Sequence, residues 1–180
     1  MISARASTKA GKNLAGGESS VKELPVRKNT RAKGYDYSSA GYYFITLCVK
    51  DRQEVLGTVV GTTAPGRPLV ELTPIGQCVA ETIQIANRNN VRIDKYVIMP
   101  NHIHMIVILD QRADDRGRSS LHQVVRNIKS FVTKRYGFSL WQPRFHDHII
   151  RDEAEYQRIW QYIDENPLRW SEDIYFIKDS

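Results

Sequence analysis

Two apolar segments lie almost end to end in the middle of the chain, and they constrain the fold more than any other feature. Residues 91–100 read "VRIDKYVIMP" and residues 102–110 read "HIHMIVILD". Each has the length and aliphatic content of a strand, and the Pro100-Asn101 junction is short enough for an antiparallel hairpin. Because strand side chains alternate between two faces, one face of the second segment is expected to lie in a core: Ile103, Met105, Val107 and Leu109.

The opposite face of the second segment carries two histidines. His102 and His104 would point the same way, about 7 Å apart along the strand, on the surface of a well-anchored sheet. Two imidazoles fixed on a rigid element could clamp one metal ion. They could equally be two polar residues on a half-exposed face, and the residues alone leave both interpretations open.

The remaining periodic segments complete a recognisable order of elements. Alternating residues 43–50 predict a strand, and residues 57–68 a loop or small hairpin. Thr73 as N-cap and Pro74 at the first helical position begin a helix. A second helix is expected over 121–136, a strand over 140–150 and a last helix over 152–166. This order is that of an α+β ferredoxin-like sandwich, with helices on one face of an antiparallel sheet and the other face open for function.

The last expected helix places two polar side chains beside its apolar stripe. An apolar stripe is expected to face the sheet: Tyr156, Ile159, Trp160 and Ile163. Tyr162 lies roughly 110° from the centre of that stripe, and Asn166 projects one turn later from the same flank. The Tyr162 and Asn166 side chains can therefore approach the same point in space. The alternative is a boundary tyrosine and an asparagine that ends the helix before Pro167.

Composition limits the class of protein. A chain of 180 residues, 41% of them hydrophobic, suits one globular domain. We expect a disordered basic tail over residues 1–26 and a single domain over 27–180. The net charge of +6 allows a polyanionic partner. Cys48 and Cys78 lack metal-motif spacing and are expected to be buried free thiols. The absence of a membrane-length apolar segment or a secretory signal predicts a cytoplasmic protein.

Several blocks together resemble a known family. "MPNHIHMIV", followed some sixty residues later by "YIDENP", resembles the single-tyrosine HUH transposases. More closely, "RKNTRAKGYDY", "YFITLCVKDR", "MPNHIHMIV", "LWQPRFHDHIIRD" and "YIDENPLRW" resemble the REP-associated tyrosine transposases, over roughly residues 27 to 170. Any single HxH is a weak signal, but five blocks in the family's order are specific.

The resemblance implies an enzyme that nicks and rejoins single-stranded DNA near small palindromic hairpins, such as REP elements. By position, His102 and His104 match the metal-binding pair, and Tyr162 matches the nucleophile on an added C-terminal helix. Asn166 matches the polar residue that completes the shell of a Mg²⁺ or Mn²⁺ ion. His146 departs from many relatives and forms a second HxH with His148, which leaves open whether metal binds there too.

Basic residues are the candidate contacts to a phosphate backbone, although a solvated face explains each of them equally well. They are Arg27, Lys28, Arg31, Lys33, Arg126, Lys129 and Lys134. Trp141 and Phe145 could stack on bases, but core packing is the preferred interpretation. Two other functions stay open: a domesticated DNA-binding protein that does not cleave, and a metal-dependent nuclease or RNA-processing protein. Both a monomer and a homodimer are compatible with the sequence.

Overall fold

The computed structural model describes residues 36, 39–61, 68–87, 90–110 and 120–177. Within these ranges it contains six strands, three α-helices and two short 3₁₀ helices. In chain order they are β1 (Gly41–Cys48), η1 (Lys50–Arg52), β2 (Gly57–Val60), β3 (Leu69–Leu72), α1 (Pro74–Ala86), β4 (Val91–Ile98), β5 (His102–Leu109), α2 (Leu121–Tyr136), β6 (His146–Ile150), α3 (Glu153–Glu165) and η2 (Asn166–Glu172). The expected tail, residues 1–26, lies outside the described residues.

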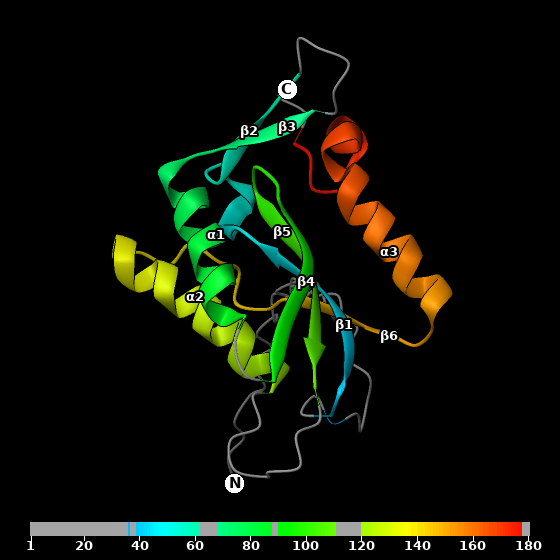
Figure 1. Ribbon diagram of the computed structural model, residues 1–180. Helices are drawn as coiled ribbons and strands as arrows, with labels where there is room; N and C mark the ends of the chain where they lie inside the picture. Colours follow the sequence, from blue (N-terminus) through cyan, green and yellow to red (C-terminus); the bar gives the residue numbers. More distant parts are fainter. Residues whose placement is uncertain (1–35, 37–38, 62–67, 88–89, 111–119, 178–180) are drawn as a thin grey trace, which may run out of the picture.

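Four strands form the main sheet in the order β4-β5-β1-β6, and every neighbouring pair is antiparallel. This is the strand order of a ferredoxin-like sandwich and confirms the predicted fold class. β2 and β3 form a separate two-stranded hairpin between β1 and α1, as one of the two sequence interpretations proposed. Figure 1 shows α1 and α2 on one side of the main sheet and α3 on the other.

Local capping sets the helix ends. The Thr73 hydroxyl accepts a hydrogen bond from the Gly76 amide at 3.1 Å, so α1 begins where the sequence predicts. Ser120 and Asp152 cap α2 and α3 in the same way. α2 ends at Tyr136 and is capped by Gly137, whose φ of 76° is left-handed. Pro167 cannot continue the α-helix, and the chain tightens there into η2.

Both faces of the central strand β5 are buried, which corrects the open face expected around the histidines. The larger core fills the space between the sheet and the helices α1 and α2, and it includes Ile103, Met105, Val107 and Leu109 as predicted. A smaller core lies under α3 on the opposite face, where Ile163 packs with Ile106 and Ile108. The sequence could not show this because α3 and η2 reach that face only through tertiary packing. His102 and His104 are consequently 0% and 2% exposed rather than on the surface.

The structure also confirms or corrects several smaller predictions made from the sequence. Cys48 and Cys78 are buried free thiols, and Trp141 and Phe145 are buried in the larger core, as predicted. The strand expected over 140–150 begins only at His146. Trp160 is 36% exposed and lies outside the core, with its ring over the Lys95 ammonium of β4 at 3.8 Å from the ring centre. In the described residues, none of the helices combines the length and the apolar character that crossing a membrane requires.

Candidate active site

The candidate site lies on the α3 side of the sheet, where β5 and β1 are paired. His102 is opposite Cys48 and His104 is opposite Thr46 in the β1–β5 register. The two imidazole rings share one face, with centroids 4.5 Å apart. Burial lowers the pKa of His102 to about 4 and holds the pKa of His104 well below its ordinary value. Both rings are therefore neutral near pH 7, the state in which imidazole binds metal.

Asn101 fixes the tautomer of His102. Its amide nitrogen donates to the backbone carbonyls of Arg52 at 3.2 Å and Tyr175 at 2.9 Å, which uses both of its hydrogens. The amide oxygen is thus left facing the His102 Nδ1 at 2.9 Å. A neutral ring must then carry its hydrogen on Nδ1 and leave a lone pair on Nε2. That Nε2 atom is buried without a hydrogen-bond partner among the described residues.

His104 lies between a strand neighbour and the last helix. Its Nδ1 is 2.8 Å from the Thr46 hydroxyl, and its Nε2 is 3.2 Å from the Tyr162 hydroxyl. Phe44 stacks on the imidazole with ring centroids 5.3 Å apart. These contacts hold the ring in one orientation, with one nitrogen toward the tyrosine.

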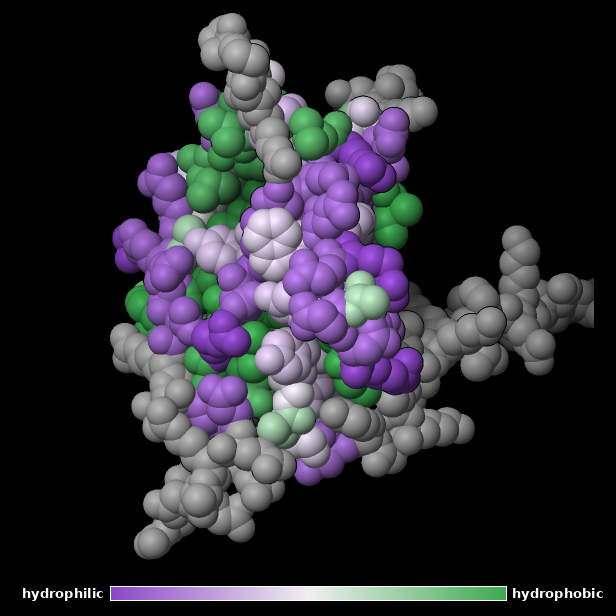
Figure 2. Space-filling view, turned by 45° about the vertical axis from the view of Figure 1, so that its right-hand side comes forward, coloured by the Kyte–Doolittle hydropathy of each residue, from purple (hydrophilic) through white to green (hydrophobic). Residues whose placement is uncertain are grey.

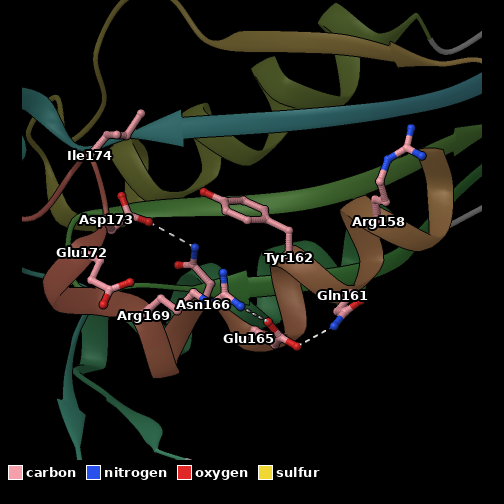
Figure 3. A pocket seen from close by; sticks show the side chains of 9 residues that line it. All are labelled: Arg158, Gln161, Tyr162, Glu165, Asn166, Arg169, Glu172, Asp173 and Ile174. Atoms are coloured by element: carbon pink, nitrogen blue, oxygen red, sulfur yellow. Dashed lines mark hydrogen bonds and ion pairs between the residues drawn. The ribbon is translucent and has the colours of Figure 1, made fainter. Parts of the chain in front are cut away.

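Tyr162 reaches the histidines from α3, where the sequence places it at the edge of the apolar stripe. Its side chain is 42% exposed, so solvent and histidine both have access to it. Burial of the hydroxyl and the nearby Asp173 carboxylate raise the pKa of Tyr162 above its ordinary value. Figure 3 shows Tyr162 and Asn166 projecting from successive turns of the helix, as the spacing predicts, with Arg158 on the turn before.

Two other tyrosines on the helices, Tyr156 of α3 and Tyr136 of α2, form hydrogen bonds elsewhere. Tyr156 donates a short hydrogen bond to Asp94, and this bond, together with burial, raises the pKa of Tyr156 to about 12. The Tyr136 hydroxyl donates to the backbone carbonyl of Pro74 at 2.8 Å, in contact with α1 on the opposite side of the sheet. Among these three tyrosines, Tyr162 is the one that contacts a histidine of the pair.

Asp173 joins the site, and the sequence did not predict it. Its carboxylate and one nitrogen from each of His102 and His104 all lie within 4.8 Å of one another, a group that can hold a metal ion. The Asn166 amide nitrogen donates to Asp173 at 3.1 Å, while the Asn166 oxygen is buried and unpartnered in the described part of the chain. No sequence signal identifies Asp173, because it comes seven residues after the last residue of the expected helix.

The donor set fits a divalent cation. Two orphaned buried atoms, His102 Nε2 and Asn166 Oδ1, would be satisfied by one. Two neutral imidazoles and a carboxylate are ligand types that suit first-row divalent metals. His146 and His148 form no such group with a third ligand among the described residues, and His148 instead pairs with Glu155 at 2.7 Å.

The structure separates the predicted basic residues from the tyrosine. Arg126, Lys129 and Lys134 belong to α2, on the other side of the sheet from α3. The Lys129 ammonium is also partly buried and lies 2.7 to 3.5 Å from the carbonyls of residues 142–144. Arg27, Lys28, Arg31 and Lys33 lie outside the described residues.

Two pockets meet at Tyr162. One, of about 500 Å³, runs along α3 and is lined by Arg158, Asn166 and Asp173 among others. The second, of about 280 Å³, is lined by His104, Phe44 and His146 on the sheet side. Hydrophilic residues cover much of the molecular face that carries α3 (Figure 2). The tyrosine side chain is therefore accessible to a ligand lying along a polar surface.

Comparison with known proteins identifies the class. No family model matches the chain. An uncharacterized Haemophilus influenzae protein is 32% identical over 84% of this chain and 93% of its own length. A REP-associated tyrosine transposase from Escherichia coli K12 is 28% identical over 74% of this chain and 70% of its own. A solved structure of a REP-associated tyrosine transposase bound to a REP hairpin superposes with a TM-score of 0.58 and 26% identity, covering 78% of this chain and 74% of that one.

A ferredoxin-like sheet with paired histidines on one strand and a tyrosine helix across them thus has homologues that are DNA transposases. Its homologues with an assigned function are REP-associated tyrosine transposases, which confirms the resemblance seen in the sequence.

Proposed function

We propose that this protein nicks and rejoins single-stranded DNA beside palindromic hairpins, with Tyr162 as nucleophile and with a divalent metal ion, Mg²⁺ or Mn²⁺, in a single domain over residues 27–180. One observation carries the proposal. The Tyr162 hydroxyl lies 3.2 Å from His104 Nε2, at the edge of the group formed by His102, His104 and Asp173. A nucleophile next to a candidate cation site is the arrangement that attack on a phosphodiester requires.

The covalent step is a transesterification. The Tyr162 oxygen forms a bond to phosphorus as the bond from phosphorus to the 3′-oxygen breaks, and the leaving oxygen takes a proton to become a free 3′-hydroxyl. The product is a 5′-phosphotyrosine, which keeps the energy of the phosphodiester. Attack by a 3′-hydroxyl then reverses the chemistry and rejoins a strand without ATP.

The chain's own residues prepare this step. The raised pKa of Tyr162 keeps its hydroxyl protonated in the metal-free protein, at 3.2 Å from His104 Nε2. His102, His104 and Asp173 would hold the cation, and Asn166 supplies a further oxygen beside them. A bound divalent cation would neutralise charge on the scissile phosphate.

Two observations support the substrate. The superposable relative was solved with a REP hairpin bound to it, and the net charge of +6 favours a nucleic acid partner. Binding should therefore weaken steeply as salt rises, and hairpin-bearing single strands should be preferred over plain duplex.

The deciding experiment is a search for a covalent adduct. The protein is incubated with Mn²⁺ and labelled hairpin-bearing single strands from the flanks of its own gene, then denatured and run on a gel. A labelled protein band is expected, with omission of metal as the control. A nick without an adduct would indicate a hydrolytic nuclease, and binding without cleavage of any strand would indicate a domesticated DNA-binding protein.

A further inference from the structure

A basic pocket of about 620 Å³ lies next to the candidate active site, and neither the sequence analysis nor the proposed chemistry uses it. It is lined by Lys50, Asp51, Arg52, Gln142, Pro143 and Arg144. The lining therefore contains three cationic side chains and one carboxylate. The volume is in the range of small-ligand sites and suits one nucleotide unit.

The backbone at this pocket is strained. Asp51 and Arg52 both have a φ of 55°, and they are the two non-glycine residues with positive φ in the described chain. The left-handed conformation is unfavourable for residues with a Cβ and tends to persist where surrounding contacts enforce it, often at ligand sites. Here Asn101 holds the Arg52 carbonyl, and the Arg52 guanidinium donates to the Ile174 carbonyl at 3.0 Å.

The opposite wall of the pocket is also fixed. Lys129 reaches it from α2 and lies within hydrogen-bonding distance of the carbonyls of Gln142, Pro143 and Arg144, with 2.7 Å to the first. Its ammonium thus binds the carbonyls of this loop instead of pointing into solvent. The Lys50 and Arg144 side chains, by contrast, are exposed and form no hydrogen bond or ion pair within the described residues. Two free cations on a rigid frame remain available to an anion.

Arg52 links this pocket to the lining of the pocket that contains Tyr162. The Arg52 guanidinium lies over the Tyr175 ring, 5.6 Å from its centre, and bonds to the neighbouring Ile174. Those same two residues line the small pocket that contains Tyr162 and His104. An extended strand with its scissile phosphate at Tyr162 can therefore continue into the basic pocket.

We propose that the pocket formed by Lys50, Arg52 and Arg144 binds a backbone phosphate of the single-stranded DNA segment that leads to the bond cut at Tyr162. The inference rests on the proposed function for its substrate, but it concerns a separate binding site. It assigns DNA contact to the segment after β1 and the loop before β6, rather than to the α2 residues that the sequence offered as candidates.

The salt dependence of binding tests this assignment. Fluorescence anisotropy of a labelled hairpin with a single-stranded extension, between roughly 50 and 200 mM KCl, gives the slope of log affinity against log salt. Each neutralised phosphate contact on a single strand contributes about 0.7 to that slope. Lys50→Ala and Arg144→Ala should each lower the slope by about this amount and weaken binding several-fold at low salt. Lys50→Arg and Arg144→Lys, which keep the charge, should retain the wild-type slope.

Arg135→Ala is the matched control, because Arg135 is an exposed cation near the end of α2 on the other side of the sheet. Its slope should equal that of the wild type, and thermal unfolding of all variants verifies the fold. A blunt hairpin without the extension separates single-strand from duplex contact, since the defect should disappear on it.

Unchanged slopes for Lys50→Ala and Arg144→Ala would overturn the inference, and so would an equal defect on the blunt hairpin. The covalent adduct formed by the wild-type protein is measured on the same strand. Its presence alongside unchanged slopes would leave the proposed function standing while this site fails, whereas its absence would count against the proposed function itself.

Discussion

At the scale of single residues, the site depends on one hydroxyl. Replacing Tyr162 by Phe keeps the ring but removes the oxygen that lies near His104, so the covalent adduct should vanish while the fold and DNA binding persist. Gel analysis of adducts and anisotropy on the same protein measure both effects.

Tyr156→Phe is the matched control for that variant. It removes a hydroxyl from the same helix, but one that bonds to Asp94 away from the histidines, so the adduct should still form. An adduct that survives in Tyr162→Phe and disappears in Tyr156→Phe would reassign the nucleophile.

Asp173 is the third ligand of the candidate metal group, and substitution can measure its contribution to metal binding. Asp173→Asn removes the negative charge nearest to the two imidazoles, and Mn²⁺ affinity, measured from the electron paramagnetic resonance signal of free Mn²⁺, should fall by about tenfold or more. Asn166→Ala should reduce it less, because a neutral amide oxygen is the weaker donor. If Asn166→Ala proved the more severe of the two with the fold intact, the ligand that the resemblance implied would be the right one.

Asn101 offers a test of how the first histidine is oriented. In Asn101→Ala the Nδ1 of His102 loses its acceptor, so the ring is free to take the other tautomer and Mn²⁺ affinity should drop about 10- to 100-fold. Nitrogen-15 shifts of the imidazole report the tautomer directly. A mixture of tautomers already in the wild type would contradict this account.

At the scale of elements, α3 is held to the sheet by a small core. Ile163 is fully buried between Ile106 and Ile108, so Ile163→Ala should leave a cavity and lower the free energy of unfolding by about 2–5 kcal/mol, against about 0.5–1.5 kcal/mol for Ile163→Val. Urea denaturation measures the loss. Because Tyr162 precedes Ile163 on the same turn, adduct formation should slow in parallel.

Leu168→Ala is the control for that prediction, since Leu168 is 48% exposed and its truncation should change stability by no more than about 0.5 kcal/mol. Equal costs for Leu168→Ala and Ile163→Ala would mean that the helix is not anchored by this core.

At the scale of the whole molecule, the buried histidines make stability depend on pH. In the unfolded chain His102 takes a proton near pH 6.5, whereas in the metal-free folded protein it stays neutral down to about pH 4. The unfolded state therefore binds more protons in this window, and the free energy of unfolding should fall as the pH decreases through it. Between pH 7 and pH 5.5 the loss is about 1 kcal/mol for each such histidine, and His104 acts in the same direction.

Urea denaturation in the presence of a chelator at the two pH values measures this loss. The double variant His102→Gln, His104→Gln should lose most of the pH dependence. An undiminished dependence in that variant would assign it to other groups.

The sequence by itself determined most of the helices and strands and their order along the chain, because periodicity and caps are local properties. The alternation around His102 and His104 defined a common face, and the helical spacing set Tyr162 and Asn166 on one flank. These placements are retained in the structure, since a strand has a period of two and a helix a period of 3.6 wherever it packs.

Only the tertiary structure decided which side chains meet and what surrounds them. The sheet face with the histidines is buried because α3 and η2 pack onto it, and this burial lowers the pKa of both rings. Asp173 reaches the histidines, and Lys50 and Arg144 share one pocket, because chain segments far apart in sequence converge there. Periodicity within one segment contains no information on such contacts, because they depend on how the segments pack against one another.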